Sequence, residues 1–142
     1  MNKTKMITKD DVNRVWYEID VTDKILGRVS VEIAVLLMGK DKPDYTPFTD
    51  SGAGVIVNNC SKIKVTGNKA TQKVYKRFSG YPSGQKETVY EKMAEKDPQY
   101  IIRHAVKGML PKNKLGARML KRLKIYDVGE THPHTAQKPV VR

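Results

Sequence analysis

The strongest constraint on the fold of this chain is a strand–helix–strand pattern in residues 16–57. Residues 16–21 alternate between apolar and polar side chains, which is typical of a strand with one buried face. Residues 25–38 then place apolar side chains at helical spacing. The short apolar run Val55–Val57 predicts a second, buried strand. This order predicts two parallel strands joined by a right-handed crossover, and therefore an α/β fold.

Residues that favour helix ends mark the expected helix boundaries. We expect Asp23 to cap the first helix and Gly39 to end it. Asp97 followed by Pro98 predicts the start of another helix, because proline is favoured in a first helical turn. Asn113 predicts the start of one more helix.

The segments between these helices carry weaker patterns. We expect an extended segment over 74–78, an irregular loop over 79–84 and a helix over 88–96. A last strand is expected over 124–128.

The length of 142 residues favours one domain. We expect an N-terminal extension over 1–15, one α/β domain over 16–128 and a polar C-terminal tail over 129–142.

A single cysteine excludes an intramolecular disulfide framework and a cysteine-ligated zinc finger. Neither a signal-peptide stretch nor an apolar run of about 18 residues is present, so we expect a cytoplasmic protein without a membrane span.

Positive charge is concentrated in the second half of the chain. Residues 62–142 carry nineteen Lys and Arg against six Asp and Glu, whereas residues 1–61 carry eight against nine. The stretches 51–86 and 98–126 contain no acidic residue. Unneutralised cations in such runs repel one another, so they favour a polyanionic partner, and nucleic acid above all.

Two basic segments have the composition of an RNA-binding surface. A helix starting at Asn113 would place Arg118, Lys121 and Arg122 on one face. Residues 75–81 interleave aromatic rings with cations, and rings of this kind stack on unpaired bases. Charge spread over loops, a helix and a tail suits folded RNA better than the straight groove of DNA. No helix-turn-helix, zinc-finger or RRM signature is present.

Several catalytic or metal-binding hypotheses have weaker support. The turn after the first strand lacks the glycines and the lysine of a phosphate-binding loop. His132 and His134 have the spacing of metal ligands, with only Cys60 and His104 left to complete a site. A Cys60–His104 nucleophilic pair is equally weakly supported. Acid–base catalysis by the strand carboxylates of residues 18 and 20 stays open, and no catalytic constellation is evident.

Five motifs occur in the order and spacing of a known family. They are Trp16-Tyr17 with Leu26-Gly27-Arg28, Tyr45-Thr46-Pro47, Val65-Thr66-Gly67-Asn68-Lys69, Ala105-Val106-Lys107-Gly108-Met109-Leu110-Pro111-Lys112, and Leu115-Gly116. On these motifs the chain resembles the bacterial large-subunit ribosomal protein L-thirteen family from about residue 16 to about residue 137.

The resemblance implies a three-layer α/β/α domain around a mostly parallel four-stranded sheet, with basic loops. It also implies a structural, non-enzymatic ribonucleoprotein component that binds large-subunit (23S-type) rRNA early in subunit assembly, beside neighbouring ribosomal proteins. We expect no cofactor, metal, DNA or homo-oligomer. Together with the basic runs, the resemblance predicts an RNA-binding set: Lys69, Lys73, Tyr75, Lys76, Arg77, Tyr81, Lys86, Lys107, Lys112, Lys114, Arg118, Lys121 and Arg122.

Three positions depart from the family pattern. Phe48 stands where the family often has histidine, and Cys60 replaces a small alanine. Ala117-Arg118 reverses the common order of arginine and a small residue, which would turn the cation by about 100° around a helix. Two other functions remain open on the same residues: an enzyme acting on RNA or nucleotides, and a free RNA chaperone or translational repressor.

Overall fold

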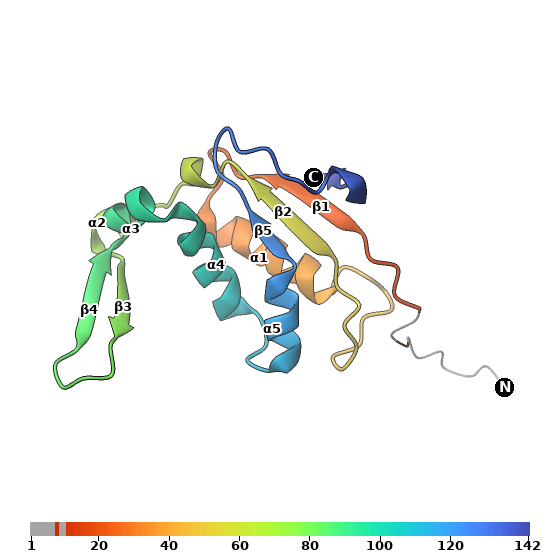
Figure 1. Cartoon of the computed structure of the whole chain (residues 1–142), viewed down its shortest axis with the longest axis horizontal. Coiled ribbons are helices and arrows are strands. Elements are labelled where there is room, and N and C mark those ends of the chain that lie inside the picture. Colours follow the sequence, from red (N-terminus) through yellow and green to blue (C-terminus); the bar gives the residue numbers. More distant parts are fainter. Residues whose placement is uncertain (1–7, 9–10) are drawn as a thin grey trace.

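A computed structural model describes residue 8 and residues 11–142; the rest of the expected N-terminal extension lies outside the described residues. The chain forms a parallel four-stranded sheet, a separate antiparallel hairpin and the helices that connect them (Figure 1). The strands are β1 (Trp16–Asp20), β2 (Gly54–Asn58), β3 (Val74–Phe78), β4 (Gln85–Val89), β5 (Leu123–Ile125) and β6 (Val140–Val141). The α-helices are α1 (Leu26–Met38), α2 (Lys69–Gln72), α3 (Tyr90–Lys96), α4 (Pro98–Met109) and α5 (Lys114–Lys121), with the short 3-10 helices η1 (Cys60–Lys62) and η2 (Thr135–Gln137).

The predicted strand–helix–strand unit is confirmed as the centre of the sheet. β1 and β2 pair in parallel, with Tyr17 opposite Val55 and Ile19 opposite Val57. The order β5-β2-β1-β6 is parallel throughout. The α/β class and the parallel four-stranded sheet are therefore confirmed.

One face of the sheet packs on the helices to form the main core. Ile19, Val55 and Val57 belong to one buried apolar cluster, together with side chains of α1, α4 and α5. Burial of continuous apolar surface on this face is the main source of stability for the domain.

The capping predictions are mostly confirmed. Gly39 ends α1 with a φ of 79°. Asp97 accepts a hydrogen bond from the Tyr100 amide at 2.9 Å, and Asn113 caps α5 in the same way. The prediction for Asp23 is wrong: this residue has a positive φ of 59° and pairs with Lys64, while α1 begins after Ile25 without a side-chain cap.

The other face of the sheet is covered by the C-terminal segment, which carries η2. His132 Nε2 lies 3.3 Å from the Glu18 carboxylate, and the His134 ring stacks on Trp16 with their centroids 5.9 Å apart. This layer completes an arrangement that agrees with the expected three-layer α/β/α domain. The segment expected to be a tail also supplies β6, which pairs with β1 and forms the edge of the sheet.

The β3–β4 hairpin projects from the body, with α2 and α3 at its base (Figure 1). The extended segment over 74–78 is confirmed as β3. The helix expected over 88–96 begins later, at Tyr90, because Thr88 and Val89 pair with β3. The loop expected over 79–84 connects the two strands.

Arg122 lies inside the protein, at 8% exposure. Its guanidinium makes a bidentate pair with the Asp50 carboxylate, with N–O distances of 2.6 and 2.7 Å. It also donates to the carbonyl oxygens of Ala53 and Leu37, at 3.2 and 3.1 Å. The assignment of Arg122 to an RNA-binding surface is therefore wrong. It follows the last residue of α5, where the chain turns inward to start β5.

Within the described residues, no helix combines the length and the hydrophobicity that a bilayer crossing requires.

We predict that Arg122→Met lowers the free energy of unfolding by about 3 kcal/mol, because it leaves the Asp50 carboxylate part-buried without its main partner. Arg122→Lys should also destabilise the protein, since an ammonium group cannot reproduce the guanidinium geometry. Urea unfolding measures both effects. The exposed Arg118→Met is the matched control, and equal stability of Arg122→Met and Arg118→Met would contradict the structural role of Arg122.

Candidate nucleic-acid interface

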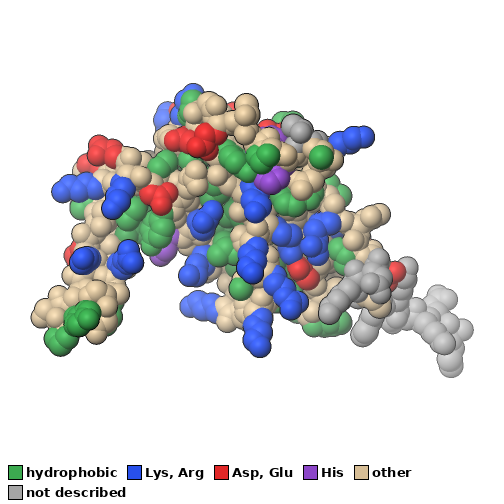
Figure 2. All heavy atoms as spheres, viewed as in Figure 1, with side chains coloured by type: hydrophobic (Ala, Val, Ile, Leu, Met, Phe, Trp, Pro, Cys, Tyr) green, Lys and Arg blue, Asp and Glu red, His purple; other side chains and the backbone are tan. Residues whose placement is uncertain are grey.

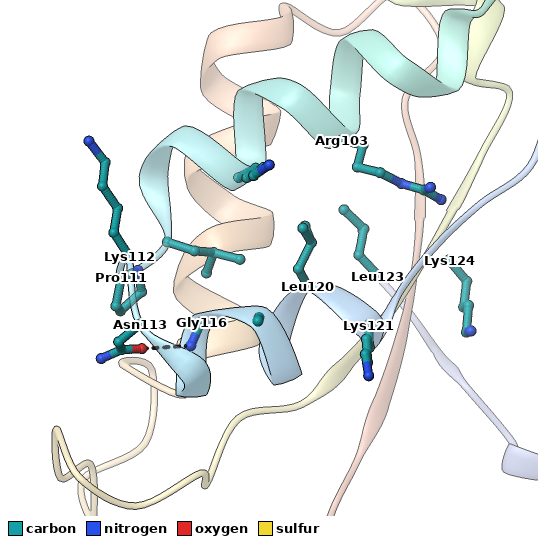
Figure 3. A pocket seen from close by; sticks show the side chains of 12 residues that line it. Arg103, Pro111, Lys112, Asn113, Gly116, Leu120, Lys121, Leu123 and Lys124 are labelled. Atoms are coloured by element: carbon teal, nitrogen blue, oxygen red, sulfur yellow. Dashed lines mark hydrogen bonds between the residues drawn. The ribbon is translucent and has the colours of Figure 1, made fainter. Parts of the chain in front are cut away.

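A groove of about 680 Å³ lies between the C-terminal part of α4, the turn that follows, α5 and the start of β5 (Figure 3). Its apolar lining comes from Leu110, Pro111, Ala117, Leu120 and Leu123. Its charged lining comes from Arg103, Lys107, Lys112, Lys121 and Lys124. Among the residues that the structure describes, none that lines the groove is acidic. It therefore combines an apolar floor with a rim of cations.

The turn between α4 and α5 is held tightly by local contacts. The Asn113 side chain accepts a hydrogen bond from the Gly116 amide at 2.8 Å (Figure 3). A Cβ atom at Gly116 would lie 1.9 Å from the Pro111 carbonyl oxygen, so only glycine allows α5 to start so close to the turn. These contacts fix the end of the groove that carries Lys112.

The groove brings together cations from α4, the turn that follows it, α5 and the start of β5. Lys107, Lys112 and Lys121, all expected to bind RNA, are exposed on its rim. Arg103 and Lys124 complete the rim and were missed, although both lie in the acid-free stretch 98–126. Figure 2 shows Lys and Arg side chains gathered over α4, α5 and β5.

Two other expected residues of α5 lie outside this groove. Lys114 is exposed at the start of the helix. Arg118 is exposed and lines a separate hollow beside Phe48 and Asp50. Position 117, where the resemblance placed an arginine, does line the groove, so the reversed order Ala117-Arg118 moves this cation to another surface.

The β3–β4 hairpin carries a second group of expected residues. Arg77, Tyr81 and Lys86 are exposed, and Tyr81 reaches 75% exposure in the connecting loop. Lys76 is also exposed and pairs with Glu87 across the hairpin at 3.1 Å. Phe78 belongs to the aromatic and cationic stretch 75–81 but was left out of the predicted RNA-binding set, and its side chain is 67% exposed.

Tyr75 does not belong to the exposed part of the hairpin. It is 6% exposed, and its ring packs edge-on against Tyr100 and His104. Burial also raises the pKa of its hydroxyl to about 12. The prediction that Tyr75 stacks on RNA is therefore wrong, because Tyr75 lies near the start of β3, where Tyr100 and His104 of α4 cover its ring.

A third group of cations lies where α1, α2 and α4 approach one another. Arg28, Lys69 and Lys73 line a hollow of about 400 Å³ with Thr66. Lys73 also places its ammonium 5.5 Å from the centre of the Tyr75 ring. Lys69 and Lys73 were expected at the interface, whereas Arg28 is an addition from the structure.

The residues considered for catalysis do not form a reactive cluster. Cys60 lies beside Asp127, not His104, and His104 packs on Tyr75 and Tyr100. Burial and the Asp127 carboxylate raise the pKa of the Cys60 thiol to about 12.

The two strand carboxylates are held in hydrogen bonds. Glu18 accepts from the Asn58 amide at 2.5 Å. Asp20 accepts from the Asn59 amide and from Thr22, and these bonds lower the pKa of Asp20 to about 2. Among the residues that the structure describes, no three His, Cys, Asp or Glu side chains are grouped to hold a metal ion.

The fold and these surfaces define a basic α/β protein that holds exposed cations on a rigid core. A family model described as Ribosomal protein L13 matches residues 14–133. A protein from Thermoanaerobacter sp. (strain X514), named Large ribosomal subunit protein uL13, is 53% identical over 137 residues, which cover 96% of this chain and 95% of the relative.

Further relatives have the same name. The protein from Trichormus variabilis is 51% identical over 139 residues, covering 98% of this chain and 91% of its own length. That from Hahella chejuensis is 51% identical over 138 residues, covering 97% and 96%. The chain therefore belongs to the Ribosomal protein L13 family.

We predict that Cys60 does not react with an aromatic disulfide reagent at about pH 8, because its thiol is buried and its pKa lies far above the ordinary value of about 8.5. The measurement is the absorbance of the released thiolate, before and after addition of denaturant. Reaction is expected only on unfolding. Rapid reaction in the native protein would contradict the inert, structural role of this cysteine.

Proposed function

We propose that this protein is a structural constituent of the large ribosomal subunit and that it binds large-subunit rRNA during early assembly of the particle. Membership in the Ribosomal protein L13 family supports the proposal, as do the relatives named Large ribosomal subunit protein uL13. The observation that carries the RNA-binding part is the acid-free cationic groove on α4, α5 and β5.

The mechanism is the positioning of cations by a folded core. The groove, the β3–β4 hairpin and the hollow lined by Arg28, Lys69 and Lys73 lie on different parts of the surface, so they can contact separate segments of one folded RNA. Each lysine or arginine that contacts a phosphate releases condensed counterions, which favours binding. Because the turn at Asn113 is already ordered, the groove lysines lose little backbone freedom on binding.

The proposal includes neighbouring large-subunit proteins as partners, a location with the ribosome in the cytoplasm, and no catalysed reaction. Irregular RNA is preferred to DNA because the cations lie on three separate surfaces and not along one helix. The exposed rings of Phe78 and Tyr81 give the hairpin a means of stacking on unpaired bases.

Sedimentation of a cell lysate tests the proposal directly. The protein is followed across the gradient at moderate and at high salt. We expect it to migrate with the large ribosomal subunit and to stay there after the high-salt wash. Migration as a free protein, or release at moderate salt, would contradict the proposal and favour a free translational repressor or an enzyme.

We predict that Lys112→Ala combined with Lys114→Ala weakens binding to a 23S-type rRNA transcript and lowers the slope of log affinity against log salt by about 2, because each phosphate contact contributes roughly one. Filter binding over a salt series measures both quantities. Lys92→Ala combined with Lys96→Ala is the matched control, since these lysines lie on α3 beside Glu91 and Glu95. An unchanged slope in the first variant would remove Lys112 and Lys114 from the interface.

A further inference from the structure

The groove has an apolar floor that phosphate binding alone does not explain. Leu120 is half-buried, Pro111 and Ala117 are exposed, and Leu110 and Leu123 lie beneath them. We propose that this floor holds the base of one unpaired nucleotide of the rRNA, while the phosphates on either side of it bind the cationic rim. The inference rests on the proposed function and names what that groove recognises.

The distribution of cations fits a strand that enters and leaves the groove. Figure 3 shows Lys112 at one end, on the turn after α4, and Arg103 and Lys124 at the other end. Leu120 and Leu123 lie between these ends (Figure 3). Within an RNA strand, each nucleotide presents the flat, apolar face of its base beside a sugar that has a phosphate on either side. The volume of about 680 Å³ lies within the range of roughly 300–1,000 Å³ that small-ligand sites occupy.

Arg103 adds a second means of holding a base. Its guanidinium is planar and stacks on flat rings as well as pairing with phosphate. Because Arg103 extends from α4 at the Leu123 end of the groove (Figure 3), it can cover a base that rests on the leucine floor.

The charge of the rim selects the occupant. Of the described residues, five cations and no acidic side chain line the groove, so a neutral or basic peptide would leave the cations unpaired. A paired RNA segment would present phosphates but keep its base faces stacked inside the helix, away from the floor. An unpaired nucleotide can place its base on the apolar floor and its phosphates against the cationic rim.

Filling the floor without changing the charge tests the inference. Ala117→Phe places a ring in the groove, whereas Val31→Phe, on the exposed face of α1, is the matched control. The probes are an oligoadenylate and an abasic oligomer of equal length, which has the phosphates without the bases. We expect Ala117→Phe to weaken oligoadenylate binding about tenfold and to leave abasic binding unchanged. Val31→Phe should change neither.

Methyl spectra of the full-length wild-type protein provide a measurement that does not depend on a variant. We expect the oligoadenylate, and not the abasic oligomer, to shift the methyl signals of Leu120 and Leu123. Equal binding of both oligomers without such shifts would overturn the inference while leaving rRNA binding intact. An acidic, leucine-containing peptide that displaces the oligoadenylate and binds more tightly would assign the groove to a protein partner instead. If the wild-type protein did not bind the rRNA transcript, the proposed function would be contradicted. Failure of the base site alone would instead show as equal binding of the two oligomers by a protein that still binds rRNA.

Discussion

The interaction on which the cationic groove depends is buried: the contact of Arg122 with Asp50 and two backbone carbonyl groups. Leu37 belongs to α1, Asp50 and Ala53 lie in the loop before β2, and Arg122 directly precedes β5. A single guanidinium therefore ties together the crossover helix, the entry to the central strand and the end of α5. The lysines of the groove keep their spacing because the end of α5 cannot move independently of the sheet. The buried Arg122 thus helps to position the exposed lysines of the groove.

Much of the central fold could be predicted from local patterns. The alternation in β1, the helical spacing in α1 and the apolar run in β2 are each set by which face is buried, and this information lies within a few residues. The Asn113 and Asp97 caps were predictable for the same reason. Asp23 was not, because the turn before α1 is held by backbone hydrogen bonds to Lys62 and Lys64, far along the chain.

Charge patterning predicted a cationic surface, but not how its cations are grouped. An acid-free run shows that cations are present, but not which of them turn inward. Helical spacing grouped Arg122 with Arg118 and Lys121, yet the helix ends at Lys121 and the next residue turns into the core. Arg103 and Lys124 join the groove only because α4 packs against α5 and β5 pairs with β2. Such pairing over long sequence distances has no local signal.

The position of β6 makes the sheet dependent on the order of synthesis. β1 is made first of the four strands, but the strand that covers its outer edge is made last, from Val140 and Val141. A ribosome adds residues one after another, so β1 spends most of the synthesis of this chain with one row of amide and carbonyl groups unpaired. An open strand edge is a template for pairing with other chains. In the interval between the folding of the central strands and the arrival of β6, the nascent protein therefore has this part of the β1 edge open.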